Sequence, residues 1–258
     1  MEWNLRGPSF AVSTACASSN HAMGLAFQMI RLGLCDAMLT GGSESMLCFG
    51  GIKAWEGLRV MSPDPGLPFS ANRNGMVQGE RAGIFVFEEL EATKARGAEI
   101  LAEVIGFAMT SDTSDIVQPS REGAARAIAG AIRDVGIALT DVGYINANGT
   151  GTAANDWTEC AAISEVFGAH AKNLMISSTK SMHGDLIGGT GAVELLACLM
   201  ALREGVVPPT IGFEVPYPDC ALDVVPNEAR EARVEVALSN AFAFGGLNAV
   251  IALRRYSG

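Results

Sequence analysis

The sequence predicts a layered α/β fold, and three observations support this. Strand-like and helix-like segments alternate along the chain, with Gly or Pro at the junctions. Apolar residues recur at helical spacing over residues 123–135, which gives that segment one apolar face. A chain of 258 residues with 49% hydrophobic content can bury a large core. Because no linker or short repeat interrupts the pattern, we predict one domain over residues 1–258.

The first part of the chain alternates short apolar runs with two helical segments. Gly33 and Gly97 stand where each helix ends, as C-terminal caps. Residues 45–83 are rich in Gly, Pro and Asn, which predicts long, partly irregular loops of the kind that often bind ligands. The predicted strands lie at residues 10–14, 37–40 and 83–87, and the predicted helices at residues 17–32 and 90–96.

The second part repeats this alternation with longer helices. Asp156 and Glu159 are placed like a capping box at the start of a helix. Glu194 interrupts the most apolar helix, which argues against a membrane span. The predicted strands lie at residues 101–109, 143–146, 174–177, 234–239 and 249–253, and the predicted helices at residues 123–135, 156–167 and 191–202.

Composition and charge exclude several classes of protein. The formal net charge of −10 would repel phosphate backbones and anionic membrane surfaces, so a nucleic-acid partner is not expected. The N-terminus lacks a basic region followed by an apolar stretch, so no signal peptide is expected either. The six cysteines form no CxxC pair and there are only three histidines, so we expect no metal site and no cofactor. We expect a cytoplasmic protein whose cysteines mostly act as small core residues.

The stretch TACASS, residues 14–19, raises the question of a nucleophile. Cys16 stands where a strand-like run gives way to a helix, and the positive end of a helix stabilises a thiolate. The free backbone N–H groups at that end could also hold an oxyanion. The alternative for a lone cysteine is a small buried thiol without chemistry.

Three further stretches combine glycine with small polar residues directly after predicted strands. The carboxyl edge of a sheet is where α/β folds collect ligand sites. These stretches are NANGTGT (Asn146 to Thr152), STKSMHGDLIGGTGAVE (Ser178 to Glu194) and NAFAFGGLN (Asn240 to Asn248). Together with TACASS, their order and spacing resemble the β-ketoacyl-acyl carrier protein synthases, most closely the type II elongation enzymes and the related nodulation and polyketide ketosynthases. The resemblance runs from about Gly7 to the C-terminus.

The resemblance implies a thiolase-like fold of two related αβαβα halves. Residues of about 1–100 would be the remainder of an incomplete first half, and about 101–258 the second half. In such enzymes a cysteine accepts an acyl chain, and two histidines promote decarboxylation of a malonyl thioester. Cys16 matches the nucleophile, and its N–H would form the oxyanion hole with that of Phe244. The other matches are a polar pair (Lys180 and Glu194), two gating aromatics (Phe242 and Phe244) and two substrate contacts (Thr150 and Thr152).

The sequence departs from this pattern at both histidines. The HGT motif of the family reads Asn148-Gly149-Thr150, and the GH position after the lysine reads Gly184-Asp185. Asparagine can donate from its amide but cannot titrate as a base, and an ionised aspartate only accepts hydrogen bonds. An anionic Asp185 would repel a malonyl carboxylate or an enolate, unless burial keeps it protonated. His183 is expected to be a neighbour and not a replacement base.

Relatives also carry an N-terminal segment ahead of TACASS. Without it, the strand at residues 10–14 would lose its neighbours and a large apolar face would be exposed. We therefore expect a homodimer, or a heteromer with a chain that supplies this segment, unless the chain is a fragment or an engineered variant.

Three functions remain open at this stage. The leading hypothesis is an acyltransferase of fatty acid or polyketide biosynthesis. It takes an acyl chain from an acyl carrier protein thioester onto Cys16 and is impaired in condensation. The second is a fully condensing 3-oxoacyl synthase that uses Asn148 and Asp185. The third is a catalytically degenerate partner subunit, shaped like a chain-length factor.

Overall fold

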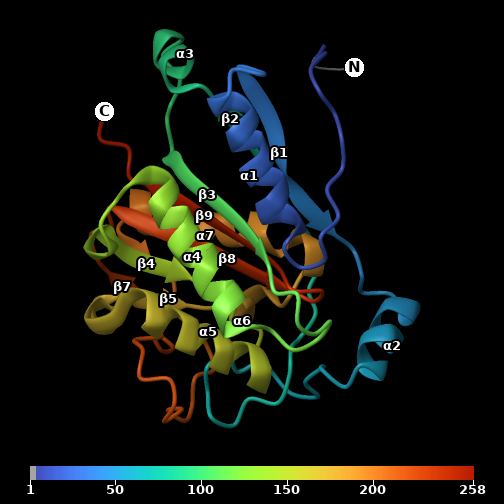
Figure 1. The fold of residues 1–258 in the computed structure, drawn as a ribbon. Coiled ribbons are helices and arrows are strands. Elements are labelled where there is room, and N and C mark those ends of the chain that lie inside the picture. The colour runs from blue at the N-terminus through green and yellow to red at the C-terminus, as the bar shows by residue number, and fades with distance from the viewer. Residues whose placement is uncertain (1–3) are drawn as a thin grey trace.

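The computed structural model describes residues 4–258 (Figure 1). Helices and strands alternate through the chain as predicted, and their bounds follow in two groups. The helices are α1 (Ser18–Arg31), α2 (Phe49–Gly57), α3 (Leu90–Ala95), α4 (Arg121–Val135), α5 (Ala153–Phe167), α6 (Lys180–His183) and α7 (Thr190–Arg203), with short 3₁₀ turns η1 (Leu139–Asp141), η2 (Gly168–Asn173) and η3 (Ile187–Gly189). The strands are β1 (Ala37–Glu44), β2 (Arg81–Glu88), β3 (Glu103–Ser111), β4 (Val142–Asn146), β5 (Met175–Ser177), β6 (Val206–Val207), β7 (Arg230–Glu231), β8 (Val236–Ala243) and β9 (Leu247–Arg254).

A five-stranded mixed sheet forms the centre of the molecule, in the order β3-β9-β8-β4-β5. β4 runs parallel to β5 and β8, whereas β9 runs antiparallel to β8 and β3. The turn between β8 and β9 contains Gly245 and Gly246, both with positive φ, which glycine adopts at little cost. This turn places the NAFAFGG stretch at one edge of the sheet.

The elements stack in layers around this sheet (Figure 1). α4 and α5 cover one face, where their apolar side chains join Ile145, Leu238 and Val250. α1 and α7 cover the opposite face with a second cluster that includes Phe107, Ala237 and Ile251. The antiparallel pair β1–β2 lies on the far side of α1 and α7. The predicted α/β class is confirmed. Its layers follow one another in the order helices (α4 and α5), central sheet, helices (α1 and α7) and the β1–β2 pair.

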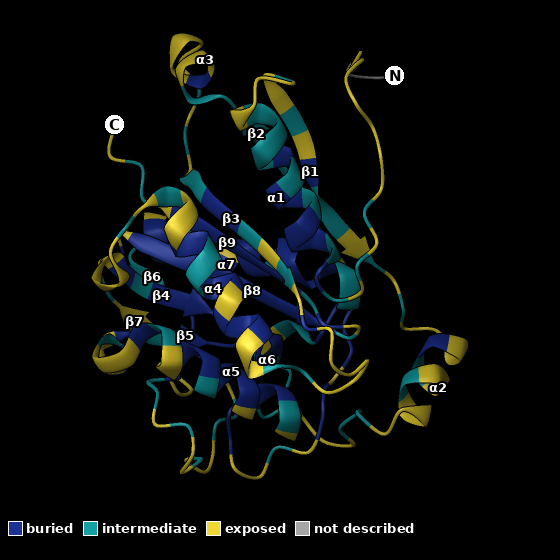
Figure 2. Ribbon diagram, viewed as in Figure 1, coloured by how far each residue is buried: buried dark blue, intermediate teal, exposed yellow. Residues whose placement is uncertain are grey.

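Burial differs sharply between the central sheet and the β1–β2 pair (Figure 2). Every residue of β8 is buried, because helices cover both faces and β4 and β9 pair with both edges. Within residues 4–258, by contrast, β1 and β2 pair only with each other. Leu39, Ile84 and Val86 leave 42%, 63% and 62% of their surface exposed on this pair. The expected apolar exposure is therefore found, but on β1–β2.

The predicted strand at residues 10–14 is absent. Residues 8–13 form no regular element, and the only pairing nearby is an isolated bridge between Thr14 and Cys16. Phe10 is 53% exposed. A β-strand needs a partner for its backbone N–H and C=O groups, and no described strand lies beside this segment. Two other expectations are corrected: residues 45–83 include the helix α2, and α5 begins at Ala153, three residues before the predicted start.

The cysteines differ from the expectation of mostly unbridged core thiols. Cys160 on α5 forms a disulfide with Cys220, sixty residues further along the chain. Among the four remaining thiols only Cys198 is buried, Cys16 and Cys35 are half-buried, and Cys48 is exposed. The sequence could not show this pairing, because it depends on α5 lying against the loop that contains Cys220. None of the helices in the described part of the chain has the length and apolarity needed to cross a membrane.

Candidate active site

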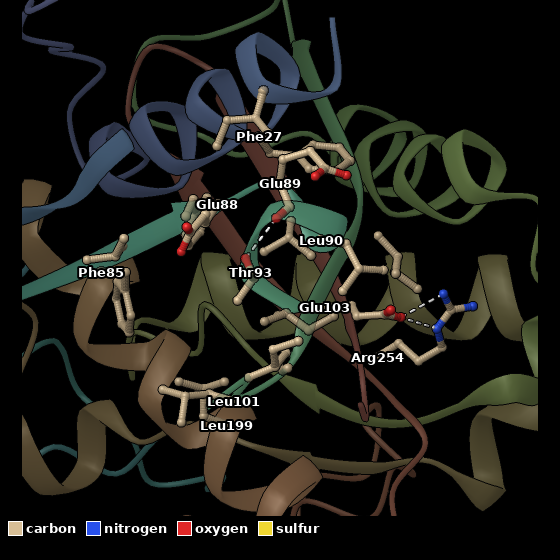
Figure 3. Close-up of a pocket in the computed structure, with 18 of the residues that line it drawn as sticks. Phe27, Phe85, Glu88, Glu89, Leu90, Thr93, Leu101, Glu103, Leu199 and Arg254 are labelled. Carbon is tan, nitrogen blue, oxygen red and sulfur yellow. Dashed lines mark hydrogen bonds and ion pairs between the residues drawn. The ribbon is translucent and has the colours of Figure 1, made fainter. Parts of the chain in front are cut away.

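Two cavities stand out, and chemistry distinguishes them better than size. The larger, about 710 Å³, lies between β2 and the start of β3. Figure 3 shows its apolar wall of Phe27, Phe85, Leu101 and Leu199, with the Glu103–Arg254 ion pair at its border. The smaller, about 320 Å³, contains Cys16 and six other residues predicted for the site: Asn148, Thr150, Thr152, Asp185, Phe242 and Phe244. We therefore take the smaller cavity as the candidate active site.

A tight turn before α1 holds Cys16. Ala15 has a φ of 49°, in the left-handed region that costs a residue with a Cβ about 1 kcal/mol or more. Side chains of α1 maintain this turn: Ser18 Oγ accepts from the Thr14 N–H at 2.9 Å and donates to the Ala15 carbonyl at 2.6 Å. The His21 ring nitrogen Nδ1 lies 2.9 Å from Thr14 Oγ1. The strained backbone therefore fixes the position of the thiol.

The charge state of Cys16 differs from the sequence-based expectation. Burial raises the pKa of the Cys16 thiol well above its usual range, and the negative charge of Asp185 raises it further. Lys180 and the backbone N–H groups of Cys16 and Phe244 act in the opposite direction but do not outweigh burial. Burial therefore opposes the thiolate form that the helix N-terminus was expected to stabilise. The two N–H groups thus act on the sulfur, which makes them the candidates for an oxyanion hole beside it.

The amide of Asn148 is fully committed as a donor. Its Nδ2 donates to Asn155 Oδ1 at 2.8 Å and to the Phe242 carbonyl at 3.1 Å. The carbonyl of Phe242 can only accept, which fixes the orientation of the amide. Asn148 is 2% exposed. Contrary to the expectation that it donates to a ligand, Asn148 has no N–H left for one.

Two buried carboxylates of α5 hold the NANGTGT loop in place. Glu159 accepts from the N–H groups of Asn148 at 2.9 Å and Gly149 at 2.8 Å. It also accepts from Asn240 Nδ2 on β8 at 3.0 Å. Asp156 accepts from the N–H groups of Phe69 and Gly151. Burial raises the pKa of both carboxyls, and these donors oppose that rise.

The predicted capping box of Asp156 and Glu159 is therefore wrong. Thr152 is the N-cap of α5, and its Oγ1 accepts from the Asn155 N–H. The predicted helix start was three residues late, which hid the role of both carboxylates as anchors of the loop. Their spacing of three residues does place them on one helix face, and that was the available signal.

Asp185 lines the same cavity. Its Oδ1 accepts from the Ile187 N–H at 2.8 Å and from Thr190 Oγ1 at 3.0 Å, and the residue is 2% exposed. His183 lies next to it but is occupied: its ring nitrogens contact the Gly184 carbonyl at 2.7 Å and Thr179 Oγ1 at 3.1 Å. Burial and the charge of Lys180 lower the pKa of His183 to about 4. His183 is absent from the residues lining the cavity, in line with its expected role as a neighbour.

Lys180 and Glu194 form a buried ion pair behind the cavity. Lys180 Nζ lies 2.6 Å from Glu194 Oε1, and both side chains are nearly inaccessible. Burial opposes the charged form of Lys180, but the carboxylates of Glu194 and Asp185 raise its pKa above the usual value. Neither residue lines the cavity. They can therefore act on Cys16 only through their electric fields.

The remaining predicted residues shape the mouth and walls. Thr150 Oγ1 and Thr152 Oγ1 lie 2.9 Å apart and line the cavity. Phe242 is buried, whereas Phe244 is half-buried and stacks on Trp55 of α2 with 5.8 Å between ring centroids. Sequence reasoning missed Trp55, because it lies in the segment expected to be irregular. Arg73, also missed, bonds the Ser70, Thr152 and Ala153 carbonyls and lies over the Tyr217 ring.

Replacing Glu159 with Gln should destabilise the protein markedly. The glutamine amide keeps one acceptor oxygen, but its NH₂ group replaces the other oxygen and meets a donor of the loop or of Asn240. At least one buried N–H then has no acceptor. We expect the free energy of unfolding to fall by about 2 to 3 kcal/mol in urea titrations. The control Glu165→Gln, on the same helix but exposed, should change it by about 0.5 kcal/mol or less. Equal effects of both variants would contradict the anchoring role.

His183 should contribute to the pH dependence of stability. Its folded-state pKa of about 4 lies below the unfolded value of 6.5, so the unfolded chain binds the proton more readily. Its contribution is complete above pH 6.5 and is lost as the pH falls towards 4. We expect the wild type to lose about 2 kcal/mol more than His183→Asn over this range in parallel urea titrations. Identical pH profiles would show that His183 titrates normally.

Family models match both parts of the chain. Residues 1–93 match the N-terminal domain of β-ketoacyl synthases, and residues 101–214 match their C-terminal domain. Nodulation protein E of Rhizobium sp. (strain N33) is 52% identical over 255 residues, which are 99% of this chain and 63% of that protein. The 3-oxoacyl-[acyl-carrier-protein] synthase 2 of Synechocystis is 46% identical over 97% of this chain and 62% of its own length. The chain thus spans less than two thirds of these relatives.

Solved structures agree with these sequence matches. The ishigamide ketosynthase/chain length factor superposes with a TM-score of 0.93 at 40% identity, over 96% of this chain and 61% of that one. AntDE:AntF, a type II PKS acyl-carrier protein in complex with its ketosynthase bound to the hexaketide, gives a TM-score of 0.95 at 35% identity, over 97% of this chain and 64% of that one. These likenesses confirm the thiolase-like ketosynthase fold, and the chain belongs to the β-ketoacyl synthase family.

Proposed function

We propose that this chain is a ketosynthase-family acyltransferase of fatty acid or polyketide assembly. It takes an acyl chain from an acyl carrier protein thioester onto Cys16, and it is impaired in decarboxylative condensation. The observation that carries the proposal is the state of the two altered positions. Asn148 has both amide hydrogens committed, and Asp185 offers an acceptor where condensation needs a donor.

Acylation depends on parts of the site that do not involve these positions. The thioester carbonyl would lie against the N–H groups of Cys16 and Phe244, which stabilise the oxyanion formed as the sulfur attacks. Because burial raises the pKa of Cys16, the thiol must lose its proton during attack, and the departing carrier thiolate can take it. The field of Lys180 favours the thiolate form at that moment. Lys180 and Glu194 are therefore positioning residues in this proposal.

Condensation depends on donors at the malonyl carbonyl. In the family pattern two histidines supply them, and here the cavity offers the oxygen of Asn148 and a carboxylate. Removing one oxyanion donor costs about 10² to 10³ in rate, so two altered positions should nearly abolish the step. A fully condensing synthase that uses Asn148 and Asp185 is the less favoured enzyme.

A partner-subunit role is the second candidate, and two observations favour it. The ishigamide ketosynthase/chain length factor aligns with nearly the whole chain. β1–β2 also presents exposed apolar side chains beside the cavity of Figure 3, which a homodimer partner or a second polypeptide could cover. The retained Cys16 and its two N–H donors favour the acyltransferase.

Acylation can be tested directly on the protein. After incubation with octanoyl acyl carrier protein, intact-mass spectrometry should show one octanoyl adduct, and Cys16→Ala should abolish it. Cys48→Ala, which removes an exposed thiol, should leave the adduct in place. No adduct on the wild type would favour the partner-subunit role, and an adduct that survives Cys16→Ala would refute Cys16 as the acceptor.

The impairment can be tested by restoring both histidines. The double variant Asn148→His and Asp185→His should release carbon dioxide from malonyl acyl carrier protein at least about 100-fold faster than the wild type. Each single variant serves as a control and should gain less. A wild type that already matches the double variant would instead support a condensing synthase with Asn148 and Asp185 in place.

A further inference from the structure

The wall of the pocket beside Cys16 offers hydrogen-bond acceptors in place of donors. Both amide hydrogens of Asn148 are used, so its Oδ1 is the atom left for a ligand, and it has no partner among residues 4–258. Asp185 uses one carboxylate oxygen for Ile187 and Thr190, and the other has no partner in the same described range. Both residues are 2% exposed, and both line the cavity with Cys16.

The second carboxylate oxygen of Asp185 also lacks an ion-pair partner within residues 4–258, although the field of Lys180 reaches this carboxylate. Among the described residues it forms no salt bridge, and Lys180 is already paired with Glu194. Arg73 lies in the cavity wall but is bound to backbone carbonyls and lies 3.6 Å from Asp156. Arg59, the other cation of the wall, lies just beyond the end of α2. A buried carboxylate with a donor on only one of its two oxygens is costly, and a cationic ligand at the second oxygen would offset part of that cost.

We propose that the second substrate of this site is a primary amine, bound as its ammonium ion by Asp185 and Asn148, and that the acyl group passes from Cys16 to its nitrogen to form an amide. The proposal rests on acylation of Cys16, as argued above. An ammonium group has three N–H donors, which suit two acceptors in the lining of one cavity. A malonyl carboxylate, in contrast, would meet like charge.

The transfer balances with groups already in the pocket. Asp185 takes one proton from the ammonium ion, and the freed lone pair attacks the carbonyl carbon of the Cys16 thioester. The oxyanion forms against the N–H groups of Cys16 and Phe244. As the carbonyl re-forms, the C–S bond breaks, and the thiolate of Cys16 takes the second proton from nitrogen. The products are an amide and the free thiol, and Asp185 returns its proton to solvent.

The rest of the pocket fits a small organic amine. Trp55, Phe242 and Phe244 supply apolar surface for an alkyl group, and Phe244 stacks on Trp55. A cavity of about 320 Å³ has room for a short chain beside the thioester. Asp185 would be a catalytic residue in this step, because it touches the reacting nitrogen.

The test uses octanoyl-Cys16 protein freed of excess thioester, with n-propylamine as the probe. We expect discharge of the adduct to saturate with amine concentration and to yield N-propyl octanamide, both followed by mass spectrometry. Asp185→Asn keeps an oxygen for Ile187 and Thr190 but replaces the free oxygen with an NH₂ group. In that variant, discharge per acylated molecule should fall about 100-fold or more.

Controls separate this inference from the acylation on which it depends. Asp141→Asn, an exposed carboxylate on η1, should discharge like the wild type, and n-propanol should yield no ester. Octanoyl protein unfolded in urea gives the rate of uncatalysed aminolysis. Discharge that is linear in amine and equal to this rate, or unchanged in Asp185→Asn, overturns the amine proposal while leaving acylation intact. Failure of the adduct to form overturns both.

Discussion

The site depends on the hydrogen bonds that the carboxylate of Glu159 accepts. This carboxylate is fully buried and accepts from two backbone N–H groups of the NANGTGT loop and from the amide of Asn240 on β8. A charged acceptor with three donors offsets the cost of its own burial and ties a helix, a loop and a strand together. The orientation of Asn148 follows from this, because the loop must present that residue to the Phe242 carbonyl at the end of the same strand.

The second constraint is electrostatic and centres on Cys16. Burial keeps the thiol protonated at rest, and Asp185 adds to this effect, while Lys180 and two N–H groups favour the thiolate. In the proposed acyl transfer, this arrangement would stabilise the charge that develops as the sulfur attacks. A resting thiolate is prone to oxidation, whereas a thiol that stayed protonated until a thioester bound would be protected.

The alternation of strands and helices and the four glycine-rich motifs could be predicted from sequence because both depend on local patterns. Seven of the nine residues chosen from these motifs line one cavity, and the other two, Lys180 and Glu194, form an ion pair outside its lining. The absence of a strand at residues 10–14, the Cys160–Cys220 disulfide and the hydrogen-bond partners of Asn148 could not be predicted, because each depends on segments far apart in the chain. The protonation of the Cys16 thiol could not be predicted for the same reason, since burial is a tertiary property.

The scaffold and the chemistry of this site can change separately. Glu159 and Asp156 hold the loop through backbone N–H groups, which are present whatever side chain stands at position 148. The Ile187 N–H and the Thr190 hydroxyl likewise need only an acceptor at position 185. If the two histidines of the family pattern are replaced at these positions, the turn at Cys16 and the neighbouring N–H donors can therefore stay in place. Under the proposed function, what changes is the second substrate that acylated Cys16 could meet, because acceptors at positions 148 and 185 would disfavour a carboxylate and favour a cation.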